Sequence, residues 1–174
     1  MKRFKSIVLL VVSLALCALA VSATAAQADP PIDDAGGTLL YDPPTLLDLT
    51  QVGQTVFIEA EADGVIGDGT FVGAIHEEYT VVHHVKAEFN TYRGVLYFDG
   101  VVMDSEGVPH EGTLTLHTRG RQDPGMVFPT DTPWHMSWVI VEGDGELEHV
   151  QGHGTGVLVG LELIYTGRVH FAGH

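Results

Sequence analysis

The sequence predicts an all-β protein, an antiparallel closed barrel of about eight strands. Short segments with alternating apolar and polar residues recur along the chain; Val56, Ile58 and Ala60 begin one of them. Turn dipeptides such as Asp144-Gly145 separate these segments. After the first 28 residues, no window keeps apolar residues at helical spacing between capping residues. Glycines inside the strand-like segments favour a small coiled barrel over a sandwich.

The first 28 residues predict a secretory signal peptide. Positive residues lie at positions 2–5, and an apolar run covers 7–21. Residues 26–28 (Ala-Gln-Ala) fit the small-x-small cleavage pattern, which makes Asp29 the first mature residue. An uncleaved anchor is the alternative, but the run is shorter than the ~20 residues that a membrane span needs. We therefore expect a secreted protein, extracellular or periplasmic, with no membrane contact after cleavage.

The charge of the mature chain limits the kinds of partner that it can bind. Cleavage leaves 146 residues and no cysteine, because Cys17 lies in the leader. The leader also carries three positive residues, so the formal net charge changes from −15 to −18. Such a surface repels nucleic acid and anionic membranes, so we expect neither as a partner. Without thiols, disulfides and thiolate sites are excluded, and stability must come from core packing.

Residues 29–54 predict an extended arm with little regular structure, because two Pro-Pro pairs and several Asp and Gly residues interrupt any period. Residues 55–174 predict the barrel domain. Within the domain, 82–89 either continues the second strand or starts another, and 120–133 is a polar loop. The expected strand segments, in chain order, are Thr55–Ala62, Phe71–Val81, Arg93–Met103, Thr113–Arg119, Trp134–Val141, a very short strand after the turn at Asp144-Gly145, another strand after the glycine bend that starts at Gly152, and Leu161–Phe171, which is one strand or a pair of strands.

The glycine-rich segments carry a family resemblance. GDGTFVG at 67–73 is similar to GHGTGVLVG at 152–160. Between them lie YFDG at 97–100, EGTLTLHTRG at 111–120 and GDGEL at 143–147. Over about residues 55–172, this order resembles the allene oxide cyclase-type barrel, including its uncharacterised secreted bacterial members.

This resemblance implies a calycin-like, eight-stranded antiparallel barrel with an apolar lumen, often in symmetric oligomers. The plant enzymes of the family cyclise a fatty-acid epoxide with an interior glutamate and bound water. No local motif around Glu59 or Glu61 identifies that glutamate in this chain.

One acid is the candidate catalytic residue. If Phe71, Ile75 and Tyr79 face the interior, strand alternation turns Glu77 inward as well. A carboxylate in an apolar lumen can act as a general acid or base, or hold a ligand. The alternatives are a bulge that reverses the alternation, or a position at a wet barrel mouth.

Four aromatic residues are the candidates to line a ligand pocket: Tyr79, Tyr97, Trp134 and Trp138. The alternative is that they are ordinary core residues, and in a barrel of this size the two roles overlap.

The ten histidines do not form a recognised ligand motif. His83 and His84 are neighbours on a strand, so their side chains point to opposite faces. His76 and Glu78 can share an ion, but His84 lies too far along the strand to join them. The chain also lacks H-E-x-x-H, G-x-S-x-G and a glycine loop that leads into a helix. We expect no metal and no cofactor.

Three functions stay open from the sequence. The first is a secreted barrel that binds a small apolar ligand or serves as a structural module. The second is a cyclase or isomerase that uses Glu77 on an apolar substrate, and the third is extracellular metal binding through histidines. A hollow lumen with Glu77 near Tyr79 or Tyr97 favours the enzyme. A lumen filled by Trp134 and Trp138 favours the inert module.

Overall fold

The structure is a computed structural model that describes residues 32–123 and 132–171. The predicted signal peptide and part of the predicted polar loop lie outside these ranges. Within them the chain forms nine strands and no helix, which confirms the all-β prediction. Consequently, the described residues contain no helix of the length and apolarity that a membrane span requires.

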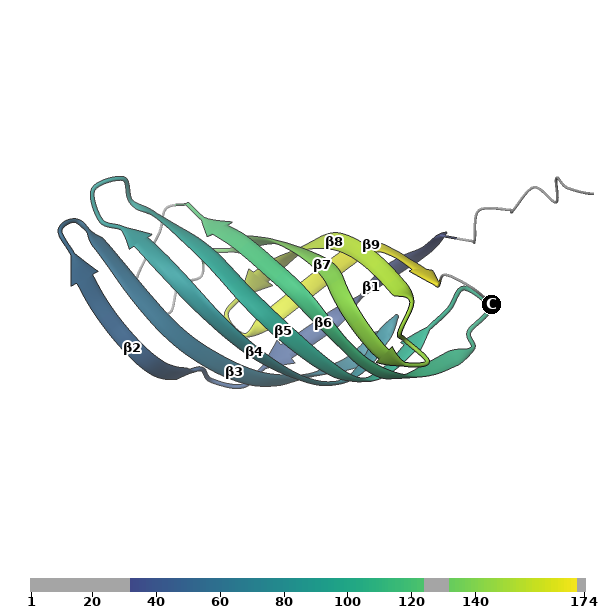
Figure 1. Ribbon diagram of the computed structural model, residues 1–174. Coiled ribbons are helices and arrows are strands. Elements are labelled where there is room, and N and C mark those ends of the chain that lie inside the picture. The colour runs from purple at the N-terminus through teal and green to yellow at the C-terminus, as the bar shows by residue number, and fades with distance from the viewer. Residues whose placement is uncertain (1–31, 124–131, 172–174) are drawn as a thin grey trace, which may run out of the picture.

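The strands form one antiparallel sheet that closes on itself (Figure 1). From β3 to β9, each strand pairs with the next along the chain. β1 pairs with both β9 and β3, so eight strands close the predicted barrel. The strand bounds are β1 Ile32–Tyr41, β2 Thr45–Val52, β3 Thr55–Gly69, β4 Phe71–His84, β5 Phe89–Met103, β6 Pro109–Gln122, β7 Trp134–Gly145, β8 Val150–Val159 and β9 Glu162–Phe171.

The interpretation of residues 29–54 as an arm with little regular structure is wrong for the part that the structure describes, from Ile32 onward. β1 is the strand that closes the barrel, and β2 follows it in the same sheet. The glycines of β1 permit close pairing, because a Cβ on Gly37 would lie 2.5 Å from the carbonyl oxygen of Asp68. Pro43 and Pro44 lie between β1 and β2, where no ladder hydrogen bond is required. A linker-like composition therefore encodes barrel strands here.

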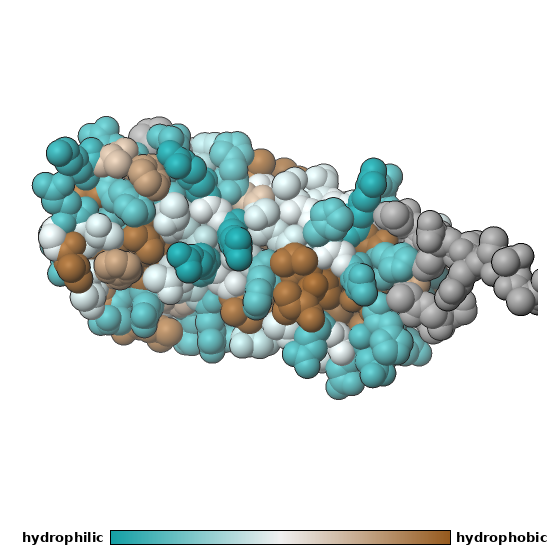
Figure 2. All heavy atoms as spheres, turned by 45° about the horizontal axis from the view of Figure 1, so that its top comes forward, coloured by the Kyte–Doolittle hydropathy of each residue, from teal (hydrophilic) through white to brown (hydrophobic). Residues whose placement is uncertain are grey.

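β2 lies outside the closed barrel. At the end where β3 pairs with β2 instead of β1, the wall of the barrel is incomplete. Residues 64–69 of β3 pair with β1, whereas residues 55–61 pair with β2. Every residue of β2 is exposed, and Leu46 and Leu49 are each 52% exposed. The β2–β3 and β4–β5 hairpins project beyond β8 and β9 at this end (Figure 1). We call it the open end, and Figure 2 shows hydrophobic side chains at its surface among hydrophilic ones.

Away from the open end, aliphatic and aromatic side chains fill the barrel together. The ring of Phe71 lies edge-on to Trp138, with ring centroids 5.9 Å apart. Two glycines make room for this indole, because a Cβ on Gly154 or Gly167 would lie 2.5 or 2.4 Å from it. The glycine-rich segment 152–160 thus supplies space for a tryptophan, in addition to the curvature expected from the sequence.

Candidate functional site

A cavity of about 250 Å³ lies at the open end of the barrel. Its apolar wall comes mainly from β3, β4, β7 and β8 and includes Ile58, Ala60, Ala62, Val81, Trp134, Met136 and Leu158. The polar side chains that line it are Tyr41, Asp42, Glu77, Tyr79, Asn90, Tyr92 and Gln122. A mainly apolar cavity with a few convergent polar groups is typical of a small-molecule site.

The Glu77 side chain lies inside the barrel and is 1% exposed, as strand alternation predicts. The alternation holds because β4 pairs with β3 and with β5 without a bulge. Its role as an acid or base stays a prediction.

Three hydroxyl groups donate hydrogen bonds to the Glu77 carboxylate. Tyr92 and Thr118 both donate to Oε1, and the Thr118 Oγ1 atom lies 2.5 Å from it. Tyr41 donates to Oε2 at 2.6 Å. The donors come from β5, β6 and β1, so the closing strand completes the set. We call these four residues the carboxylate cluster.

Gly94 provides the space in which the carboxylate cluster packs. It lies directly opposite Tyr79 on β4 and Thr118 on β6. A Cβ at Gly94 would lie 2.7 Å from Glu77 Oε1, 2.7 Å from Thr118 Oγ1 and 2.8 Å from the Tyr92 hydroxyl oxygen. A side chain at this position is therefore incompatible with the observed cluster.

The phenols around Glu77 retain their protons over a wide pH range. Burial raises the pKa of Tyr41 and of Tyr92 well above the ordinary value, and the charge of Glu77 raises both further. Burial, followed by the same charge, raises the pKa of Tyr79 to about 12. At neutral pH these groups are hydrogen-bond donors, not phenolates.

A second polar chain borders the cavity. His83 Nδ1 lies 2.6 Å from Asn90 Oδ1, and the Asn90 amide donates to Gln122 Oε1 at 2.9 Å. The Gln122 amide donates to the Thr132 carbonyl oxygen, also at 2.9 Å. Because the Asn90 oxygen accepts, His83 Nδ1 is the donor in this chain. The chain fixes the orientation of two amide side chains that line the cavity.

Of the aromatic residues predicted to bind a ligand, Tyr79 and Trp134 line the cavity. Together with Tyr92 they form a row of rings, with centroids 5.2 Å apart for Tyr79–Tyr92 and 6.1 Å for Tyr92–Trp134. Trp138 does not border this cavity and instead packs in the filled part of the barrel with Phe71.

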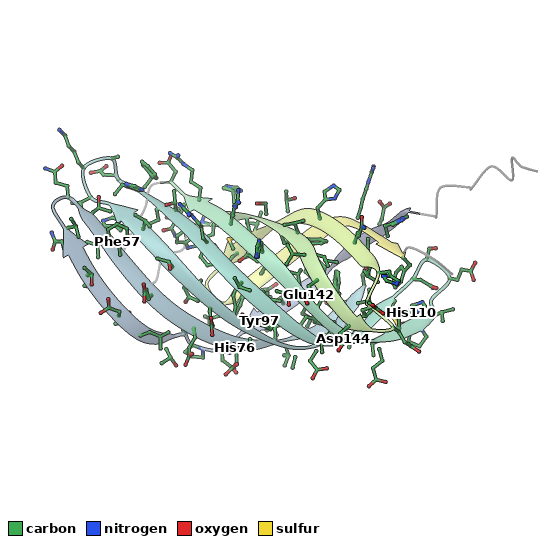
Figure 3. All side chains as sticks on the ribbon, in the orientation of Figure 1. Phe57, His76, Tyr97, His110, Glu142 and Asp144 are labelled. Atoms are coloured by element: carbon green, nitrogen blue, oxygen red, sulfur yellow. The ribbon has the colours of Figure 1, made fainter. Side chains whose placement is uncertain are left out.

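The prediction that Tyr97 lines the pocket is wrong. Its neighbours Leu96 and Phe98 are buried, so alternation along β5 turns Tyr97 outward, where it is 44% exposed. Its ring stacks on that of His76 from β4, with centroids 6.3 Å apart and the two residues labelled on adjacent strands in Figure 3.

No group of three or more His, Asp, Glu or Cys side chains suited to a metal ion occurs in residues 32–123 and 132–171. His76 instead pairs singly with Asp63, at 2.9 Å between Nδ1 and Oδ1. This hydrogen bond raises the pKa of His76.

Sequence reasoning missed Tyr41, Tyr92, Thr118 and Gly94. Tyr92 lay one residue before the expected strand at Arg93, although it shares the parity of the inward-facing Leu96. A longer strand would have placed it inside. Tyr41 was assigned to the arm, so its contact with Glu77 had no signal in the sequence.

Comparison with known proteins supports the fold alone. No model of a known protein family matches the sequence, and neither does any curated protein. A solved structure from Shewanella oneidensis MR-1, described as a protein with unknown function from the DUF3224 family, matches with a TM-score of 0.62 and 15% sequence identity. The match covers 83% of this chain and 100% of that one. At this identity the likeness concerns the barrel and carries no function.

Proposed function

We propose that this protein is a secreted barrel that binds a small, largely apolar ligand in the cavity at its open end. The single observation that supports this most is a cavity with apolar walls that encloses one hydroxyl-bound carboxylate. A barrel that served only as a structural module would gain stability by filling this space, because voids forfeit packing energy. The leader-like first 28 residues support secretion.

Binding of a neutral apolar dye tests this proposal. Phenylnaphthylamine is uncharged at neutral pH and fluoresces when it leaves water. It is larger than the cavity, so we expect one end of the dye to enter and the other to extend past the open end. We expect it to bind the wild type, and we expect Ala60→Leu, which fills the cavity from β3, to weaken binding at least about tenfold. Ala74→Leu is the matched control, because Ala74 is exposed on the neighbouring strand β4.

Two results would contradict the proposal. One is a dye affinity that is the same in wild type and Ala60→Leu, and the other is no dye binding by a folded wild type. Leu158→Trp fills the cavity from β8 and serves as a second variant if Ala60→Leu misfolds.

Catalysis on an apolar substrate is the second candidate, and the carboxylate cluster favours it. A carboxylate fixed by three donors in a low-dielectric cavity can accept a proton from a bound substrate. The resemblance to allene oxide cyclases makes ring closure of an epoxide the reaction to test. We expect Glu77→Gln to abolish any such turnover while dye binding persists. Equal turnover by Glu77→Gln and wild type would refute catalysis by Glu77.

A further inference from the structure

We propose that the cavity selects an organic cation, an amine with a compact apolar body, whose ammonium group binds the open acceptor position of Glu77. This inference rests on the proposed function and specifies its ligand. It follows from the acceptor geometry of Glu77, the charge of the cavity lining and the row of aromatic rings.

The carboxylate cluster has an unoccupied hydrogen-bond acceptor position on Glu77 but no free hydrogen-bond donor. An ionised carboxylate offers about four acceptor positions. Two hydroxyls occupy Oε1, and Tyr41 occupies one position on Oε2. The three donating hydroxyls are all engaged by Glu77, so the complementary ligand group is an N–H or O–H donor. A ligand with acceptors alone would have to withdraw a hydroxyl from Glu77 to bind the carboxylate cluster, which leaves the Tyr79 phenol as its donor elsewhere in the lining.

The charge of the lining distinguishes an ammonium group from a neutral hydroxyl. The described residues that line the cavity include two carboxylates, Glu77 and Asp42, and no Lys, Arg or His. His83 reaches the cavity only through Asn90. In a low-dielectric cavity an ammonium beside Glu77 gains Coulomb energy, whereas a ligand carboxylate is repelled with no cation to offset it. The formal net charge of −15 also draws cations toward the protein.

The aromatic row supplies a second attraction for a cation. Tyr79, Tyr92 and Trp134 are contiguous and line the same cavity as Glu77. Aromatic faces attract ammonium groups, and Trp and Tyr do so more strongly than Phe. Rings and carboxylate together therefore fit a ligand that is cationic at one end and apolar at the other.

The cavity volume limits the apolar body of the ligand. An engineered cavity of about 150 Å³ in another protein binds benzene. At about 250 Å³, this cavity has room for one aromatic ring with a short aminoalkyl chain. Phenethylamine is a suitable probe, and phenethyl alcohol and hydrocinnamate present the same ring with a neutral and an anionic group.

Calorimetric titration of the full secreted protein with these three probes, at neutral pH and low salt, tests the inference. We expect phenethylamine to bind at least about tenfold more tightly than phenethyl alcohol, and hydrocinnamate to bind more weakly than either. Glu77→Gln should remove the preference for the amine and leave the alcohol affinity within about threefold. Glu78→Gln is the matched control, because it removes the same charge from an exposed position and should keep the preference.

An amine that binds no more tightly than the alcohol, or an acid that binds as tightly as the amine, overturns the inference. Wild-type protein alone gives this answer, so it does not depend on the folding of Glu77→Gln. The outcome also separates the two proposals. If phenylnaphthylamine enters the cavity and the probes show no charge preference, only the cation inference fails. If the dye does not enter, the binding function itself fails.

Discussion

Replacing Gly94 by alanine is the sharpest test of the carboxylate cluster. Gly94 faces the point where three oxygen atoms converge, from Glu77, Tyr92 and Thr118. The substitution adds one methyl group and leaves every hydrogen-bonding side chain in place. A loss of stability would therefore report steric displacement of the cluster.

The distances set the size of the effect. The new Cβ would lie 2.7–2.8 Å from the three oxygens, so each must retreat by roughly 0.6 Å to reach an ordinary contact. They cannot all do so, because Thr118 and Tyr92 are themselves hydrogen-bonded to Glu77. Losing one hydrogen bond to a charged group costs about 1.5–3 kcal/mol, and overpacking costs about 1–3 kcal/mol. Alanine recovers about 0.5–1 kcal/mol of backbone entropy, so we expect a net loss of about 1.5–5.5 kcal/mol.

Urea unfolding followed by tryptophan fluorescence measures this loss. Gly67→Ala is the matched control, because a Cβ at Gly67 on β3 has no atom within 4 Å. We expect the control to keep the stability of the wild type or to gain up to about 1 kcal/mol, because alanine lowers the backbone entropy of the unfolded chain. If Gly94→Ala is as stable as the control, the three oxygens do not converge on Gly94, and the hydrogen-bonded packing around Glu77 is refuted.

Two further predictions follow from the pKa shifts. The raised pKa values of Tyr41 and Tyr92 keep both phenols protonated in the folded state at pH values where they lose their protons in the unfolded chain, in which the tyrosine pKa is about 10. The free energy of unfolding is therefore unaffected below pH ~10. Above that pH it falls by up to about 1.4 kcal/mol per pH unit for each phenol. Tyr41→Phe or Tyr92→Phe should flatten this loss in urea unfolding measured from pH 8 to 11, and an unchanged slope would show that the phenols are not buried. Asp63→Asn should lower the pKa of His76 in an NMR titration, because the hydrogen bond to Asp63 raises it, and an unchanged pKa would mean that the contact is absent in solution.

Local alternation was sufficient to place Glu77 but not its partners. A strand has a period of two residues, so Phe71 and Ile75 fix the direction of every side chain on β4 as long as no bulge intervenes. The partners are set by register between strands. Tyr41 is 36 residues from Glu77, and Thr118 is 41 residues away. No local pattern encodes those contacts.

The closing strand shows why composition misled the prediction. Proline and glycine usually mark loops, and both are frequent in residues 29–54. In β1 the glycines serve close strand pairing, and all four prolines lie outside the strand in the sequence, two before Ile32 and two after Tyr41. The interpretation of this segment as an arm therefore missed both the strand that closes the barrel and Tyr41, a hydrogen-bond donor to Glu77.

Local sequence patterns also could not distinguish the roles of the two tryptophans of β7. Trp134 and Trp138 share one parity, yet Trp134 borders a cavity and Trp138 fills the core. The difference lies in what faces them. Gly154 and Gly167 accommodate the Trp138 indole, so large and small residues complement each other there. At the open end the small Ala60 also faces inward, but β1 and β8 end before they cover it. The cavity thus results from a short wall combined with a small side chain, which is why filling it from β3 should close it without disturbing Trp138.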